Sequence, residues 1–228
     1  MITQAHEAYN AQDYVKAFQL YDALANSGDV EAMTSLAFMY QNGFGVEQDE
    51  AKVLELYTKA AEAKQPYALF NLGLLYANGI GGVEHDQFKA HDLYLQAAER
   101  EVPPAMYEIA LMLERGLGCL QNYSEAAFWY EEAAKRGHTE AFNNLGVLYK
   151  EGHGVLKDYK RAFLCFSRAA ERDLSQALYN LGLLYDQGLG CEEDHDKALD
   201  LCRKAAYLGH EKAKKIIAGL QDDGKIVF

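Results

Sequence analysis

Proline is scarce in this chain, with three residues among 228, whereas glycine occurs 19 times. A proline inside a helix removes a backbone hydrogen bond and clashes with the preceding turn, so its scarcity leaves room for long helices. Glycine is then the residue that ends helices and forms turns. Half of the residues are apolar, which is enough for a sizeable core. The composition therefore favours helices separated by glycine turns over a proline-rich β protein.

Cysteine is also sparse, and its spacing excludes the usual cysteine-based sites. The sequence holds no Cys-x-x-Cys pair and no Cys/His spacing that suggests a zinc site. Sparse cysteines of this kind are typical of reduced thiols, so we expect a cytoplasmic protein. A periplasmic or secreted location is the alternative if a signal peptide has been removed. The four cysteines are Cys119, Cys165, Cys191 and Cys202.

Two further absences concern membranes and nucleic acids. No window holds 18 consecutive apolar residues, so we expect no membrane span. The first residues lack the basic and apolar regions of a signal peptide. Lysine and arginine total 22 against 34 aspartates and glutamates, a formal net charge of −12. Such a surface repels a phosphate backbone, so a nucleic-acid partner is not expected.

The sequence contains internal repeats with a period of about 36 residues. The hexapeptide Asn-Leu-Gly-Leu-Leu-Tyr occurs at 71–76 and again at 180–185. Alanines recur at steps of 36, 37, 36, 36 and 36 residues. After each of the first five come Leu or Ile at plus four, Gly or Ala at plus five, Tyr or Leu at plus eight, and then a Gly-x-Gly. The alanines are Ala32, Ala68, Ala105, Ala141, Ala177 and Ala213.

The second half of each unit repeats as well. An Asp or Asn precedes a helical pattern, an aromatic residue follows eight positions later (Cys202 in the last unit), and an Ala-Ala pair comes next. Recurrence in this many columns indicates a repeat protein. The Asp/Asn column comprises Asp13, Asp49, Asp86, Asn122, Asp158 and Asp194.

Each unit therefore predicts a helix, a glycine turn and a second helix. The Asp or Asn side chain is expected to cap the second helix, a contribution of ~1 kcal/mol each. The Gly-x-Gly is expected to end the first helix. A dinucleotide site would need a strand before the glycines and a helix starting within them, so no phosphate site is predicted. Stacking of such hairpins predicts an all-α solenoid, a right-handed α-α superhelix with one continuous core.

The whole chain, 1–228, is predicted to be one solenoid domain. Residues 1–29 supply a degenerate first repeat and residues 30–210 supply five full repeats. Residues 211–228 supply a lysine-rich capping helix and a tail of unknown role.

The clearest repeat lies in 140–170, with Glu-Ala-Phe-Asn-Asn-Leu-Gly-Val-Leu-Tyr-Lys-Glu-Gly-His-Gly-Val followed by Asp-Tyr-Lys-Arg-Ala and Arg-Ala-Ala. On these motifs the sequence resembles the Sel1-like repeat family, relatives of tetratricopeptide repeats, over about 30–210. The resemblance implies a non-enzymatic scaffold for protein–protein interactions. The unit at 104–138 departs from the pattern with Leu113 and Ala110. A secreted branch of the family carries a disulfide in each repeat, but Cys119 and Cys191 lie two repeats apart, so no such bridge is expected.

No catalytic, cofactor or metal site is predicted. The seven histidines are not paired with a nucleophile at a mechanistic spacing, and solvated turn positions account for them. His195 lies among Glu192, Glu193, Asp194 and Asp196, but this run lacks the alternating ligand spacing of a calcium loop.

A binding groove is the remaining candidate site. The resemblance to tetratricopeptide repeats implies that first helices line a concave surface, with the positions two and six after the column alanine pointing inward. Aromatic and leucine residues there would form an apolar trough, and the neighbouring asparagines could bind a peptide backbone. A packing role for the same asparagines is equally compatible with the sequence. The candidate residues are Thr34, Phe38, Phe70, Asn71, Leu74, Tyr107, Leu111, Asn143, Asn144, Val147, Tyr179, Asn180 and Leu183.

The sequence thus predicts a scaffold or adaptor, not an enzyme, that binds an extended protein segment and needs no cofactor. The acidic surface favours a partner segment that is basic or neutral. A monomer is expected. The alternative is a structural assembly subunit that self-associates through its repeat ends or an aromatic face.

Overall fold

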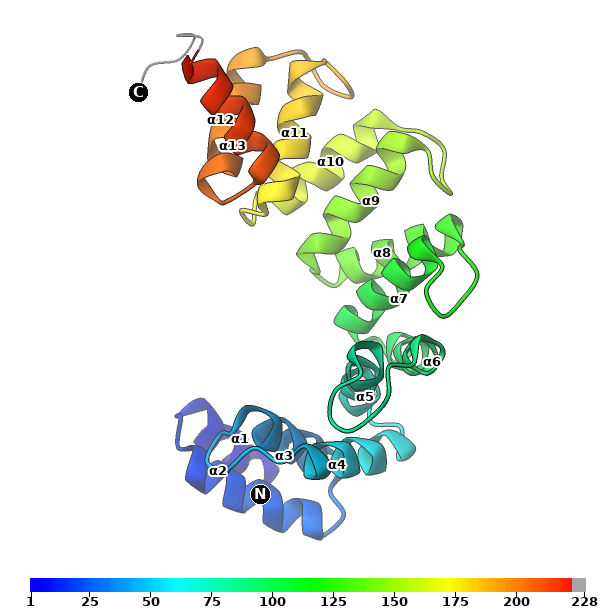
Figure 1. Cartoon of the computed structure of the whole chain (residues 1–228), viewed down its shortest axis with the longest axis vertical. Coiled ribbons are helices and arrows are strands. Elements are labelled where there is room, and N and C mark those ends of the chain that lie inside the picture. Colours follow the sequence, from blue (N-terminus) through cyan, green and yellow to red (C-terminus); the bar gives the residue numbers. More distant parts are fainter. Residues whose placement is uncertain (223–228) are drawn as a thin grey trace. The chain divides into compact units, whose positions relative to one another are not determined.

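The computed structural model describes residues 1–222, which form helices and the turns between them (Figure 1). The predicted tail at 223–228 lies outside the described residues. The chain divides at Leu120–Gln121 into two compact units, each of which is described by itself. This boundary falls in the loop that precedes Asn122, inside the predicted repeat at 104–138. The prediction of one solenoid domain over 1–228 stays a prediction.

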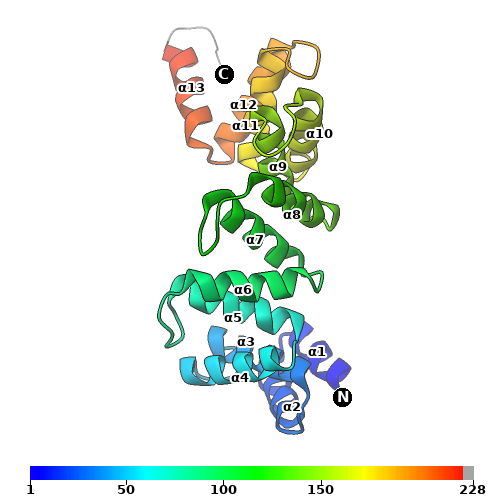
Figure 2. The same cartoon turned by 90° about the vertical axis from the view of Figure 1, so that its right-hand side faces the viewer.

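Both units are built from helices of 9 to 13 residues. The first unit contains α1 (Ile2–Asn10), α2 (Tyr14–Asn26), α3 (Val30–Asn42), α4 (Glu50–Glu62), α5 (Pro66–Asn78), α6 (Gln87–Ala98) and α7 (Pro103–Arg115). The second unit contains α8 (Tyr123–Lys135), α9 (Thr139–Glu151), α10 (Tyr159–Ala170), α11 (Ser175–Asp186), α12 (His195–Tyr207) and α13 (Glu211–Asp222). Within a unit each helix packs against the next, as Figure 2 shows for α5 and α6.

The predicted helix starts are confirmed for the second helix of every repeat. The side chain of each Asp or Asn in the column accepts a hydrogen bond from a backbone N–H in the first turn, at 2.9–3.2 Å. These bonds satisfy donors that have no partner within the helix itself. The six capped helices are α2, α4, α6, α8, α10 and α12.

The two glycines have different roles in most of the Gly-x-Gly loops, although α11 ends with Gln187 as the C-cap, one residue before the first glycine of its loop. The first is the predicted helix stop: Gly43, for example, caps α3 in the left-handed conformation with φ +70°. The second, such as Gly154 at φ +68°, lies against the start of a neighbouring second helix, where a Cβ would overlap the backbone of Tyr123 and Ser124. The loop can therefore lie directly on α8 only because residue 154 has no side chain.

The core of each unit is formed by small residues on one helix and an aromatic ring on its neighbour. The column alanines from Ala32 to Ala177 are fully buried. The largest buried rings are the aromatics of the second helices, Tyr57 and Tyr94 in the first unit and Tyr130 and Phe166 in the second. Alanine or glycine opposite a ring lets two helices approach closely, which accounts for the small residues in the repeat signature.

Candidate functional site

Two apolar pockets contain members of the predicted groove columns, one in each unit. The N-terminal pocket lies among α1, α2, α3 and α5 and has a volume of about 270 Å³. It includes three of the predicted site residues, Thr34, Phe38 and Asn71. The full lining of the N-terminal pocket is Tyr9, Tyr21, Thr34, Ser35, Phe38 and Asn71.

Aromatic rings form the wall of the N-terminal pocket. The Tyr9 ring meets the Phe38 ring edge-on, with centroids 6.5 Å apart, and both meet Phe44 at 6.1 Å. The Tyr14 ring stacks on the Phe44 ring, with centroids 4.7 Å apart, and so extends the aromatic cluster. Phe38 remains 41% exposed although it is a large apolar residue, so its ring is available to a partner.

Polar groups lie beside the aromatic wall of the N-terminal pocket. Tyr21 is buried and forms a hydrogen bond with Ser35; burial raises its pKa, which that bond partly offsets. Thr34 donates to the carbonyl of Val30 at 3.0 Å, so its hydroxyl donor is already used within α3. The half-buried side chain of Asn71 makes no hydrogen bond to any described residue. Asn71 therefore offers this pocket a polar group that is free to bind a ligand.

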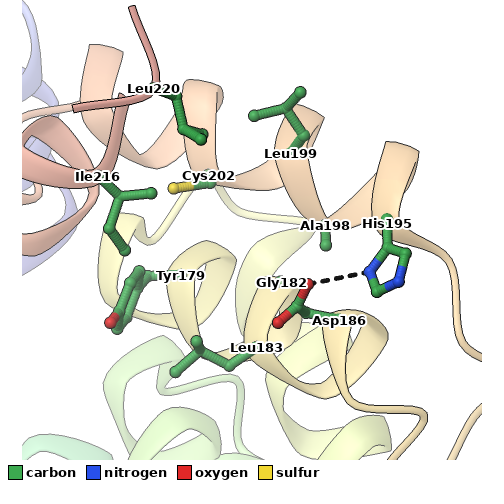
Figure 3. A pocket seen from close by; sticks show the side chains of 10 residues that line it. All are labelled: Tyr179, Gly182, Leu183, Asp186, His195, Ala198, Leu199, Cys202, Ile216 and Leu220. Atoms are coloured by element: carbon green, nitrogen blue, oxygen red, sulfur yellow. Dashed lines mark hydrogen bonds and ion pairs between the residues drawn. The ribbon is translucent and has the colours of Figure 1, made fainter. Parts of the chain in front are cut away.

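The C-terminal pocket lies between α11, α12 and α13 and is also about 270 Å³ in volume (Figure 3). Two of the predicted site residues, Tyr179 and Leu183, line it from α11. The capping helix α13 contributes Ile216 and Leu220 from the opposite side. The full lining is Tyr179, Gly182, Leu183, Asp186, His195, Ala198, Leu199, Cys202, Ile216 and Leu220.

Charged and polar groups lie at one side of this apolar pocket. His195 and Asp186 are joined by a 3.0 Å contact between Nδ1 and Oδ1, and the other ring nitrogen of His195 lies 3.0 Å from Glu193 Oε1. The Tyr179 ring stacks on the His210 imidazole at 4.4 Å. Burial lowers the pKa of His210, with the nearby Lys212 acting in the same direction, so this ring is favoured in its neutral form. The pocket thus combines an apolar interior with a polar margin.

Three of the predicted asparagines form a hydrogen-bond chain inside the second unit. Asn180 on α11 donates to Asn143 Oδ1 at 2.9 Å, and Asn143 in turn donates to Asn144 Oδ1 at 3.2 Å. Asn144 donates to the Tyr130 hydroxyl on α8 at 3.2 Å. Asn143 and Asn180 are 6% and 7% exposed. The chain gives these asparagines a packing role that links three helices, and their predicted contact with a partner stays a prediction.

We expect Asn180→Ala to lower the free energy of unfolding by ~2 kcal/mol, because it leaves the buried Asn143 carbonyl oxygen without its donor. Asn71→Ala, the matched variant in the same repeat column, should cost less than ~0.5 kcal/mol because its side chain is half exposed and makes no hydrogen bond to the described residues. Urea unfolding followed by circular dichroism measures both values. Equal losses for the two variants would contradict the packing role of Asn180.

The other predicted site residues belong to neither pocket. They are half-buried on the first helices of their repeats. Phe70 lies against the buried Tyr94 ring at 5.8 Å. Glu108, next to Tyr107, occupies the repeat position that holds an asparagine in other repeats. Burial raises the pKa of the Glu108 carboxyl, and the nearby charge of Arg115 opposes this shift. The residues in this group are Phe70, Leu74, Tyr107, Leu111 and Val147.

Sequence reasoning missed several lining residues because they come from the two ends of the chain. Tyr9 lies in the degenerate first repeat, and Ile216 and Leu220 lie on the capping helix. Neither segment carries the repeat signature that identifies columns. The one available signal was a large apolar residue outside the repeat signature.

Residues 1–222 contain no cluster of three or more metal-binding side chains, and no helix in that range is long and apolar enough to span a membrane. All four cysteines are free thiols, half-buried or buried. Burial raises the pKa of Cys165 to about 12, so this thiol stays protonated and packs as a small apolar group.

The sequence was compared with models of known protein families, and one family matches most of the chain. The Sel1 repeat model matches residues 11–29, 30–64, 66–102, 103–138, 139–174 and 175–210. No curated protein matches the sequence at a significant level.

Among solved structures, a Sel1 repeat protein from Oxalobacter formigenes is 31% identical, with a TM-score of 0.87, and the match covers 96% of this chain and 87% of that one. The protective antigen c5321 of uropathogenic Escherichia coli shares the fold, with a TM-score of 0.82 and 24% identity over 98% of this chain and 52% of the antigen. A putative sel1 repeat protein from Klebsiella pneumoniae is more distant, at a TM-score of 0.55 and 21% identity over 90% of this chain and 99% of that one. The predicted class, an all-α solenoid of helix–turn–helix repeats, is confirmed, and the chain belongs to the Sel1 repeat family.

Proposed function

We propose that this protein is an interaction scaffold whose N-terminal and C-terminal pockets each bind apolar side chains of an extended segment of a partner protein. Sel1 repeat proteins are generally protein-interaction scaffolds and are generally non-catalytic. The position and chemistry of the two pockets support their role as the binding sites. Free, partly buried thiols support the cytoplasm as the location in which it acts.

One observation carries the proposal. The same two repeat columns, two and six positions after the column alanine, line a pocket in both units: Thr34 and Phe38 in the first, Tyr179 and Leu183 in the second. A packing role would bury these columns uniformly. Phe38 is instead 41% exposed at the edge of an apolar cavity.

The size and polarity of the pockets fit protein side chains. Each volume of about 270 Å³ lies below the ~300–1,000 Å³ of typical small-molecule sites, so a pocket holds one or two side chains of a longer ligand. The free amide of Asn71 can donate to and accept from the backbone of such a segment. The net charge of −12 steers a basic or neutral segment toward the protein.

The test starts from a phage-displayed library of random linear peptides selected on the full chain. Enriched peptides should carry apolar residues flanked by lysine or arginine. We expect Phe38→Ala to weaken peptides bound in the N-terminal pocket about 10-fold, and Tyr179→Ala to weaken peptides bound in the C-terminal pocket to the same extent, as is typical for an aromatic anchor in a pocket. Asn71→Ala should lower the affinity of the same peptides whose binding is weakened by Phe38→Ala. Fluorescence anisotropy with labelled peptides measures the affinities.

Val15→Ala is the matched control, because Val15 is 60% exposed on α2 and lines neither pocket. Its affinity for the selected peptides should equal that of the unchanged chain. The proposal is wrong if the peptides bind the Phe38 and Tyr179 variants as tightly as the unchanged chain, or if no peptide is enriched.

A further inference from the structure

Two exposed apolar residues lie on the second helices α8 and α10 and line neither pocket. Phe128 on α8 is 55% exposed and Leu164 on α10 is 62% exposed. Each lies six residues after the N-cap of its helix, a position that is polar in every other repeat. The column comprises Gln19, Glu55, Asp92, Phe128, Leu164 and Asp200. Two adjacent repeats therefore present large apolar side chains where the others present polar ones.

The charges around the two apolar residues are opposite in sign. Phe128 is surrounded by glutamates three residues before it and three and four residues after it, namely Glu125, Glu131 and Glu132. Leu164 is surrounded by cations four and three residues before it and four residues after it, which are Lys160, Arg161 and Arg168. Residues three and four apart share one helix face, so the charged residues around Phe128 and around Leu164 lie on the same surface as that apolar residue.

The opposite charges also match position by position. Counted from the N-cap, Glu125 on α8 corresponds to Arg161 on α10. In the same way Glu132 corresponds to Arg168. At the end of the helices Lys135 corresponds to Glu171, with the signs reversed. Three corresponding positions thus carry opposite charges around one apolar pair.

The two helices present these residues side by side. The C-terminal ends of the two helices lie close together, because Arg172, just after α10, donates to the carbonyl of Gly137, just after α8, at 3.0 Å. Both helices pack on α9.

We infer that the α8–α10 face, defined as Phe128 and Leu164 with their surrounding charges, binds a second copy of this chain. A two-fold axis that runs between the two helices places α8 of one copy on α10 of the other. The acidic surface of α8 then faces the basic surface of α10 at both contacts, and Phe128 and Leu164 of each copy lie within the same interface. The same face placed on itself by any operation that pairs α8 with α8 would oppose glutamates to glutamates.

The local ion pairs on this face do not compete strongly with such a contact. Glu132 is paired with Lys135 and Arg136 at 2.8 Å, and Arg168 with Glu171 at 3.7 Å. Exposed pairs of this kind contribute only ~0–1 kcal/mol each, so exchanging them for intermolecular pairs costs little.

The size of the face limits the strength of the association. Helices of 13 and 12 residues are about 18–20 Å long, and two of them are about 20 Å wide together, so the face covers roughly 400 Å². This is about half of a standard interface of ~800 Å² per partner, so we expect a dimer with a dissociation constant of tens of micromolar or weaker. This differs from the monomer expected from the sequence, and it does not depend on the proposed pockets.

Sedimentation velocity over micromolar to millimolar concentrations tests the inference. The unchanged chain should dimerise at the upper end of this range, and high salt should weaken the dimer because facing charges are screened. Two charge-reversed chains provide the decisive comparison: E125K/E131K makes α8 basic, and K160E/R168E makes α10 acidic. Arg161 is left unchanged because it also donates to the Tyr149 hydroxyl at 3.3 Å.

Each reversed chain alone should dimerise at least ~10-fold more weakly, because like charges then face each other at both contacts. An equal mixture of the two should recover the affinity of the unchanged chain to within about 3-fold, because both contacts are again complementary. The control chains E62K/E99K and K212E/K215E carry the same changes of net charge at exposed positions elsewhere, and they should dimerise like the unchanged chain. Thermal melts verify that every variant is folded.

The inference would be overturned if the unchanged chain stayed monomeric at all concentrations tested. A dimer that forms equally well in both reversed chains would also overturn it, because the contact would then lie elsewhere. Failure of the mixture to recover dimerisation would exclude the two-fold pairing of α8 with α10.

Discussion

Gly154→Ala is expected to lower the free energy of unfolding of the second unit by ~3 kcal/mol or more. Two costs add. A left-handed conformation at φ +68° costs an alanine ~1 kcal/mol, and its Cβ would overlap the Tyr123 carbonyl carbon and the Ser124 nitrogen. These are backbone atoms at the start of α8, so they cannot move away as a flexible side chain would. The loop must shift off α8, and the variant should unfold at a markedly lower temperature in calorimetry.

Gly209→Ala separates the two costs. Gly209 also has a positive φ, +93°, but no atom lies within 4 Å of the position its Cβ would take. We expect this control to lose only the ~1 kcal/mol of the backbone conformation. Similar losses in the two variants would show that the close approach of the loop at Gly154 adds nothing to stability.

The close approach at Gly154 is a repeated feature of the stack. The second glycine of three other loops meets the backbone of a preceding second helix in the same way, and these are Gly45, Gly118 and Gly190. The loop at Gly81 differs, because it holds an extra glycine, and there the nearest atoms are those of the flexible Leu75 side chain at 3.3 Å. The second glycine therefore fixes how closely successive repeats stack, which is a function apart from ending a helix.

Local chemistry explains which parts of the fold could be predicted from the sequence. An N-cap such as Asp158 acts on the N–H groups of its own first turn, three residues away, so its role is visible in a short stretch of sequence. In most loops the first glycine acts on its own helix in the same manner. The second glycine could not be interpreted correctly, because the Tyr123 backbone that it meets lies about 30 residues earlier in the chain.

The candidate site was less predictable for the same reason. The sequence placed Asn71, Asn144 and Asn180 in one column, yet their surroundings differ. Asn144 meets a tyrosine hydroxyl of the preceding second helix, whereas the corresponding partner of Asn180 is Phe166, which has no hydroxyl, and Asn180 turns to Asn143 instead. One column thus holds three different bonding situations, and only the neighbouring repeats decide among them.

Phe166→Ala is expected to cost ~4 kcal/mol, the largest loss of any single change discussed, because the ring is fully buried. The Phe166 ring lies against Gly146 on α9. A Cβ built on Gly146 would lie 2.7 Å from Phe166 Cε1 and 2.8 Å from Cδ1. The glycine is therefore required by the ring and not by its backbone conformation, since alanine is the better helix former by ~1 kcal/mol.

That requirement predicts a measurable coupling between the two positions. Gly146→Ala alone should destabilise, because a buried ring must shift to admit the methyl group. Phe166→Leu alone should also destabilise, because it leaves a cavity. In the double variant the methyl group occupies space that the ring has left, so the combined loss should be smaller than the sum by at least ~1 kcal/mol. Urea unfolding of the four chains measures this interaction energy.

Gly182→Ala provides the matched comparison for the cycle. Its added Cβ would meet the Ala198 carbonyl oxygen at 3.2 Å and no aromatic ring, so its loss should simply add to that of Phe166→Leu. Coupling at Gly146 together with additivity at Gly182 would show that the small residue and the aromatic ring of a repeat are selected as a pair. The native alanines Ala37 and Ala110 occupy the same column and are fully buried. Additivity at both positions would mean that the glycine column has no dependence on the ring, and the close helix packing would need another cause.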